Sequence, residues 1–182
     1  MKKSYFPKEE NEPHYAELFI SWLNIGHNFD YIISLNSTQD DPVDAYALSP
    51  TQKPKLNFQI TIADGGFLAA AGFQHTHRKF KPAIVVDSEV SIPWIKDAIK
   101  RKAEKLYPNP QDLILLVGGY APVASPALIE NQLCGKYDDL RFRGIYYVVT
   151  PQSEYPSGFV VAIKDAFTDS KFDSKLRAVQ TA

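Results

Sequence analysis

Three polar residues, Asp44, Gln59 and Thr61, have side chains and a spacing that can form an oxygen-rich site. Asp44 opens a short predicted strand, and Gln59 and Thr61 share the polar side of the next one. If the two strands are neighbours, the carboxylate and the two polar side chains converge at one edge of a sheet. With the main-chain carbonyl of Ile60, such a group can hold a hard divalent cation through oxygen.

Each of these residues also has a plainer interpretation. Asp44 follows Asp41-Pro42-Val43, so it is alternatively a turn residue. Gln59 and Thr61 are alternatively a solvent-facing or edge pair. The elements that carry them decide between the two interpretations.

The candidate residues belong to a run of three predicted strands. Residues 29–35 are rich in β-branched and aromatic side chains, residues 43–48 form a second short strand, and residues 56–62 alternate strictly. The alternation places Leu56, Phe58, Ile60 and Ile62 on one face. Apolar positions at helical spacing predict a helix before these strands, from His14 to Gly26.

Helices and strands alternate in the second half of the chain. Ser91 opens a predicted helix that reaches about Leu106, and Ser125-Pro126 opens another that Gly135 closes. Residues 113–117 are continuously apolar, which is typical of a strand buried on both faces. Further strands are predicted at residues 83–86, 145–149 and 159–163.

This order predicts an α/β fold. Hairpin-linked strands come first and crossover helices later, so we expect a mixed central sheet flanked by helices on both faces. We assign residues 1–13 to a polar N-terminal arm, residues 14–165 to a single α/β domain and residues 166–182 to a polar tail.

The order of elements resembles the PD-(D/E)xK nuclease superfamily, which has the restriction-endonuclease-like fold. The core of that family is a helix, a three-stranded meander, a crossover helix and a further strand (α-β-β-β-α-β). Its aspartate aligns with Asp44, and its (D/E)-x-K element aligns with Gln59-Ile60-Thr61. The glutamate often found in its first helix aligns with Glu17.

The chain departs from the family's motif at two positions. Gln59 replaces an acidic metal ligand, and Thr61 replaces the lysine that the family uses to position or activate water. The family tolerates lysines that have moved from this strand to the next helix. In the corresponding predicted helix of this chain, Lys102 lies near the middle of an apolar stripe defined by Ile95, Ala98, Ile99 and Leu106. The alternatives are that Lys102 reaches solvent from the end of the stripe and that Glu17 is an ordinary solvated helix residue.

The resemblance implies two possible functions. In the active version, Asp44 binds Mg²⁺ with help from Gln59 and the Ile60 carbonyl, Lys102 stabilises charge or orients water, and Glu17 assists, as in a metal-dependent nuclease. In the competing version, the same scaffold has no catalytic activity and no metal, and it binds nucleic acid or a protein partner.

A basic segment between the third strand and the second helix is a second candidate site. It interleaves charge with aromatic residues, which suits phosphate contact; its polar members are His75, His77, Arg78, Lys79 and Lys81. A zinc pair formed by the two histidines and a solvated loop are the alternatives.

Composition limits the partners and the compartment. The net charge of −1 means that nucleic acid would have to be held by a local patch. A single cysteine, Cys134, which we expect to be a small buried residue, fits a reducing compartment. The polar N-terminus is not typical of a signal peptide, and no segment reaches the length of a membrane span. We therefore expect a cytoplasmic protein without membrane contact; the sequence does not specify its oligomeric state.

Overall fold

The computed structural model describes residues 8–35, 43–51, 53–63, 91–119, 123–151 and 155–167. The elements along the chain are α1 (Lys8–His27), β1 (Ile32–Leu35), β2 (Ala45–Leu48), β3 (Leu56–Ala63), α3 (Ser91–Ala103), the 3₁₀ turn η2 (Pro110–Asp112), β4 (Leu113–Gly119), α4 (Pro126–Leu133), β5 (Gly144–Val149) and β6 (Phe159–Lys164). The predicted strand at residues 83–86 and the basic segment with His75 and His77 lie outside the described residues.

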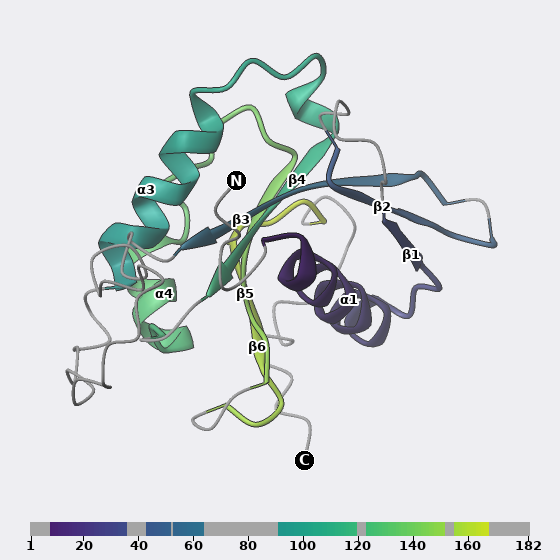
Figure 1. The fold of residues 1–182 in the computed structure, drawn as a ribbon, viewed down its shortest axis with the longest axis horizontal. Helices are drawn as coiled ribbons and strands as arrows, with labels where there is room; N and C mark the ends of the chain where they lie inside the picture. The colour runs from purple at the N-terminus through teal and green to yellow at the C-terminus, as the bar shows by residue number, and fades with distance from the viewer. Residues whose placement is uncertain are drawn as a thin grey trace, which may run out of the picture.

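In the described part of the chain, six strands form one open sheet in the order β1-β2-β3-β4-β5-β6 (Figure 1). The first three are an antiparallel meander. The strands β3, β4 and β5 run parallel, and β6 pairs antiparallel with β5. The sheet is therefore mixed, as the order of hairpins and crossovers predicted.

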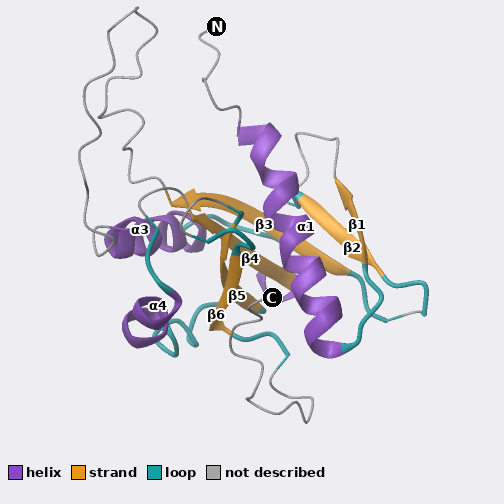
Figure 2. Cartoon of the chain, turned by 90° about the horizontal axis from the view of Figure 1, so that it is seen from below, coloured by secondary structure: helices purple, strands orange, loops and turns teal. Residues whose placement is uncertain are grey.

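Helices cover both faces of this sheet (Figure 2). The helix α1 packs Phe19 and Leu23 against Phe58 and Ile60 of β3 on one face. The helices α3 and α4 pack against the other face, where the cluster includes Ile95, Ile99, Leu115, Val117 and Ile129. Because successive residues of a strand point to opposite faces, each central strand contributes to both clusters. The predicted α/β architecture is confirmed.

Two element boundaries differ from those predicted. The helix α1 begins at Lys8, upstream of Pro13, although a proline inside a helix removes one hydrogen bond. The helix α3 ends at Ala103, so Leu106 lies beyond its last turn and is fully exposed instead of joining the apolar stripe.

The far end of the described chain is also packed. Phe167 is buried in the cluster under α1, so the packed part of the chain reaches at least that residue. None of the described helices combines the length and the apolar character that crossing a membrane requires.

Candidate functional site

Asp44 lies where β2 stops pairing with β3. Its backbone N–H donates to the Phe58 carbonyl at 2.9 Å, and its Oδ2 accepts a hydrogen bond from the Ile60 N–H at 2.6 Å. The carboxylate thus continues the hydrogen bonding of the β3 edge just before β2 begins at Ala45. This dual attachment positions Asp44 more firmly than an ordinary turn residue.

The Ile60 carbonyl belongs to the same edge. Since the N–H and C=O of one strand residue point to the same side, this carbonyl faces the side on which Asp44 lies. The guanidinium of Arg101, an exposed residue of α3, donates to the next carbonyl on that side, Ile62, at 3.4 Å. The β3 edge beyond β2 is therefore bordered by a carboxylate and by one side of α3.

Gln59 and Thr61 point to the face that α3 covers. They alternate with Phe58 and Ile60, which face α1, so the predicted assignment of faces is confirmed. Gln59 is 4% exposed and Thr61 is 7% exposed. The alternative of a solvent-facing pair is therefore wrong.

Lys102 joins Gln59 and Asp44 from the last turn of α3. Its ammonium donates to Gln59 Oε1 at 2.6 Å and lies 3.8 Å from Asp44 Oδ2. Lys102 is 7% exposed, so the alternative that it extends into solvent is wrong. Because an ammonium has only donors, the amide of Gln59 must turn its oxygen toward it.

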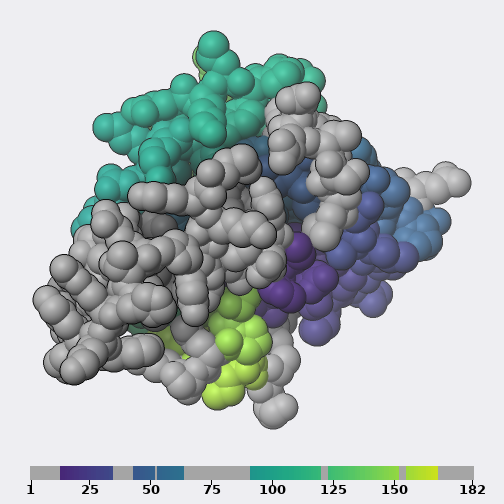
Figure 3. Space-filling view, in the orientation of Figure 1, coloured from purple at the N-terminus to yellow at the C-terminus, as the bar shows by residue number. Residues whose placement is uncertain are grey.

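Because Lys102 is buried, its ammonium needs close polar partners. Moving an ammonium out of water costs about several kcal/mol, which only close partners offset. Gln59 supplies a short, charge-assisted hydrogen bond, and Asp44 supplies the opposite charge. In Figure 3, the teal surface of α3 and the segment after it lies above the blue surface of β2 and β3.

Tyr107 is a member of the site that the sequence did not suggest. Its hydroxyl donates to Gln59 Oε1 at 3.2 Å, and its ring packs against Phe142 with 5.8 Å between ring centroids. Burial, and secondarily the negative charge of Asp44, raises the pKa of Tyr107 to about 12. The phenol therefore stays protonated, as a donor, at neutral pH.

The oxygens at this edge match the kind of ligand that Mg²⁺ prefers. They come from the Asp44 carboxylate, the Gln59 amide and the Ile60 carbonyl. Asp44 is the one acidic side chain in this set, and among the described residues no three His, Cys, Asp or Glu side chains gather as a metal-binding group. The donor set therefore fits a hard divalent cation in kind and supplies a single negative charge.

Glu17 does not join the other candidates. It belongs to α1, on the opposite face of the sheet from α3. Its side chain is 56% exposed, and its carboxylate lies 3.5 Å from the imidazole of His14. The structure thus agrees with the alternative of a solvated helix residue.

Two further candidates from the sequence remain. The basic segment with Arg78, Lys79 and Lys81 lies outside the described residues. Cys134 is half-buried, and its thiol contacts the Ala162 carbonyl at 3.1 Å, in agreement with a packing role.

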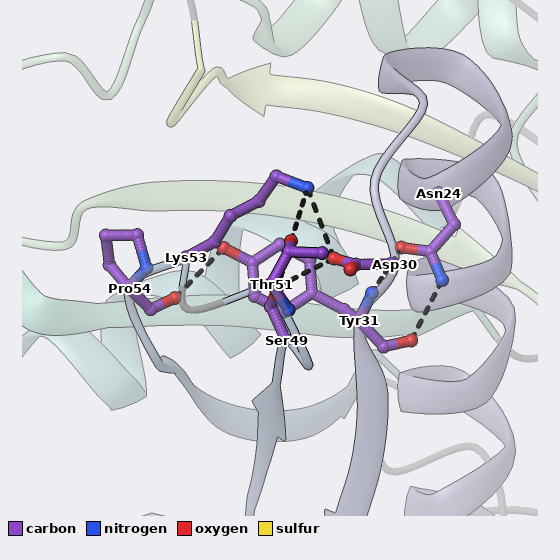
Figure 4. A network of polar contacts seen from close by, with 7 residues as sticks. All are labelled: Asn24, Asp30, Tyr31, Ser49, Thr51, Lys53 and Pro54. Atoms are coloured by element: carbon purple, nitrogen blue, oxygen red, sulfur yellow. Dashed lines mark hydrogen bonds and ion pairs between the residues drawn. The ribbon is translucent and has the colours of Figure 1, made fainter.

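A second polar cluster lies beyond the other end of β2 (Figure 4). Asp30 accepts hydrogen bonds from Ser49 at 2.6 Å and from Lys53 at 3.2 Å, and Asn24 of α1 bonds both backbone groups of Tyr31. The hydrogen bonds from Ser49 and Thr51, and then Lys53, lower the pKa of Asp30 to about 2. This cluster fastens the β2–β3 turn to the segment between α1 and β1.

The comparisons with known proteins give no relative for this chain: no family model matches it, and neither a curated protein nor a solved structure does.

Proposed function

We propose that the protein is a PD-(D/E)xK-like protein that hydrolyses phosphodiester bonds of nucleic acid with the help of a divalent cation. The elements α1, β1, β2, β3, α3 and β4 follow one another in the order of that family's α-β-β-β-α-β core. Asp44 directly precedes the second strand of the meander, and Gln59-Ile60-Thr61 lies within the third, which are the positions of the family's motif.

The observation that carries the proposal is the position of Lys102. Its ammonium is buried, within 2.6 Å of Gln59 and 3.8 Å of Asp44. A buried lysine is expensive unless it has partners or a function. Here it supplies the positive charge that Thr61, in the place of the family's lysine, does not provide.

The proposed chemistry assigns one task to each residue. Asp44, Gln59 and the Ile60 carbonyl would hold the cation, which supplies positive charge at the phosphate and lowers the pKa of a bound water. Lys102 stabilises the negative charge that develops on the phosphate oxygens, because it is preorganised and shielded from water. Thr61 and Glu17 take no chemical step in this scheme.

A second candidate function is a binding module without catalysis, for nucleic acid or a protein partner. It is favoured by the charge balance of the site, where one carboxylate faces one ammonium. Hard divalent cations bind more tightly as the charge of their ligands increases, so a site with a single carboxylate binds Mg²⁺ weakly.

One experiment separates these functions. Supercoiled plasmid, single-stranded DNA and RNA are incubated with Mg²⁺ or Mn²⁺ and with the parent protein, Asp44→Ala or Asp30→Ala. Asp30 is the matched control, because it is also an aspartate beside a lysine but lies outside the site. The nuclease proposal expects cleavage by the parent and by Asp30→Ala and none by Asp44→Ala.

The other outcomes are also informative. Equal cleavage by all three proteins would reject the site. Absence of cleavage, together with retention of nucleic acid by the parent in a gel shift with EDTA, would favour a nucleic-acid-binding module. Absence of both would reject both nucleic-acid functions.

A further inference from the structure

The amide oxygen of Gln59 accepts two hydrogen bonds within the site. Lys102 Nζ donates at 2.6 Å and the Tyr107 hydroxyl donates at 3.2 Å. An amide oxygen has two lone pairs, so these two donors occupy both. A cation that binds this oxygen must therefore displace one of them.

Tyr107 is the donor that is easier to displace. The bond from Lys102 is short and charge-assisted, and the ammonium is also held by Asp44 at 3.8 Å. The bond from Tyr107 is longer and joins two neutral groups. Neutral hydrogen bonds of this kind contribute less to stability than bonds to charged groups.

The Tyr107 hydroxyl is nevertheless well positioned. Tyr107 follows the end of α3 and lies outside any helix or strand. Its ring packs against Phe142 and the apolar cluster beneath α3, which fixes the direction of the hydroxyl. The loop therefore presents the phenol to Gln59.

We propose that Tyr107 is a positioning residue that competes with the divalent cation for Gln59 Oε1. This inference rests on the proposed function of the same site. Without a cation, Tyr107 and Lys102 together hold the Gln59 amide toward α3. A cation bound to Gln59 Oε1 would take the place of the phenol, and the Lys102 ammonium would stay beside Asp44. Tyr107 thus raises the cation concentration that the site needs.

The test is the dissociation constant of Mn²⁺, measured by isothermal titration calorimetry on the full chain. Tyr107→Phe removes the hydroxyl and keeps the ring, and it should bind Mn²⁺ about two- to ten-fold more tightly than the parent. Tyr137→Phe is the matched control, because Tyr137 packs against the same apolar cluster; its dissociation constant should equal that of the parent. Thermal unfolding of each variant establishes that the proteins compared are folded.

A double-mutant cycle shows whether the effect passes through Gln59. In Gln59→Glu, the carboxylate offers additional lone pairs, so removing the Tyr107 hydroxyl should give less than half of the gain that it gives in the parent. An equal gain in both backgrounds would overturn the inference.

Unchanged or weaker Mn²⁺ binding by Tyr107→Phe, with measurable binding by the parent, would also overturn the inference and leave the proposed function intact. No Mn²⁺ binding by the parent at millimolar concentrations would instead reject the metal-dependent function and, with it, the competition.

Discussion

An aspartate–lysine pair lies near each end of β2, and the two pairs differ in burial. At one end, Lys53 and Asp30 lie 3.2 Å apart, and both side chains are 33% exposed. At the other end, Lys102 and Asp44 lie 3.8 Å apart, with side chains 8% and 24% exposed. The closer pair belongs to a surface turn, whereas the more distant pair lies between a helix and a sheet.

This difference shows that surroundings, more than separation, decide what such a pair does. Water and the hydroxyls of Ser49 and Thr51 share the charge of Asp30, so the Lys53 pair stabilises the turn only modestly. The Lys102 pair has lost most of its water, so each partner depends on the other. Four substitutions or conditions test this contrast.

Asp44→Ala should destabilise the protein by about 2–4 kcal/mol, because it leaves the buried Lys102 ammonium without its counter-charge and the Ile60 N–H without its acceptor. Asp30→Ala should destabilise the protein much less, because solvent screens the charge of this carboxylate. Urea unfolding of the two variants and the parent measures the difference. Equal costs would mean that burial does not distinguish the two pairs.

For the proposed nuclease activity, Lys102→Met should lower the rate of phosphodiester cleavage by about a hundredfold, because it removes a preorganised positive charge from the site. Its free energy of unfolding should change much less than in Asp44→Ala, since an apolar side chain fills the same volume. Lys53→Met is the control and should cleave at the parent rate. Plasmid-nicking rates and urea unfolding provide the two measurements; a slow Lys53→Met would assign the effect to general loss of charge.

Gln59→Glu should tighten Mn²⁺ binding by about tenfold, because it adds a second carboxylate to the proposed cation ligands. Gln111→Glu makes the same change at an exposed position of η2 and should have no effect. Calorimetric titration of both variants checks this. Similar tightening by Gln111→Glu would point to non-specific attraction by the added charge.

Acidification should remove the stabilisation from the Asp30–Lys53 pair, because it protonates Asp30. The pKa of Asp30 is about 2 in the folded protein, below its ordinary value of 3.8. The stabilisation from this carboxylate is therefore complete above about pH 4 and is lost as the pH falls toward 2. The melting temperature of Asp30→Asn should approach that of the parent over this interval. A difference in melting temperature that stays constant as the pH falls would contradict the lowered pKa of Asp30.

Much of the fold follows from residue patterns. The alternation at residues 56–62 predicted which side chains of β3 share a face, and helical spacing placed Lys102 near the middle of the apolar stripe of its helix. Helical spacing failed for Leu106, because α3 ends before that residue. A periodic pattern identifies a face and gives little information about where the period stops.

The site itself was only partly predictable. Asp44, Gln59 and Lys102 were expected together, but Tyr107 was not, because it lies in a loop whose path depends on how its ring packs against Phe142. Glu17 was included through the family resemblance alone, whereas its direction on the helix indicated a solvated residue. For this position, the residue pattern was the better guide.

The separation of these residues along the chain has a consequence for biosynthesis. Asp44 and Gln59 emerge early from the ribosome, whereas Lys102 lies 43 residues after Gln59, beyond the whole β3–α3 crossover. A nascent chain that ends before α3 has the carboxylate and the amide but neither the amine nor the phenol. The site therefore cannot assemble before translation has passed Tyr107 and left that residue outside the exit tunnel.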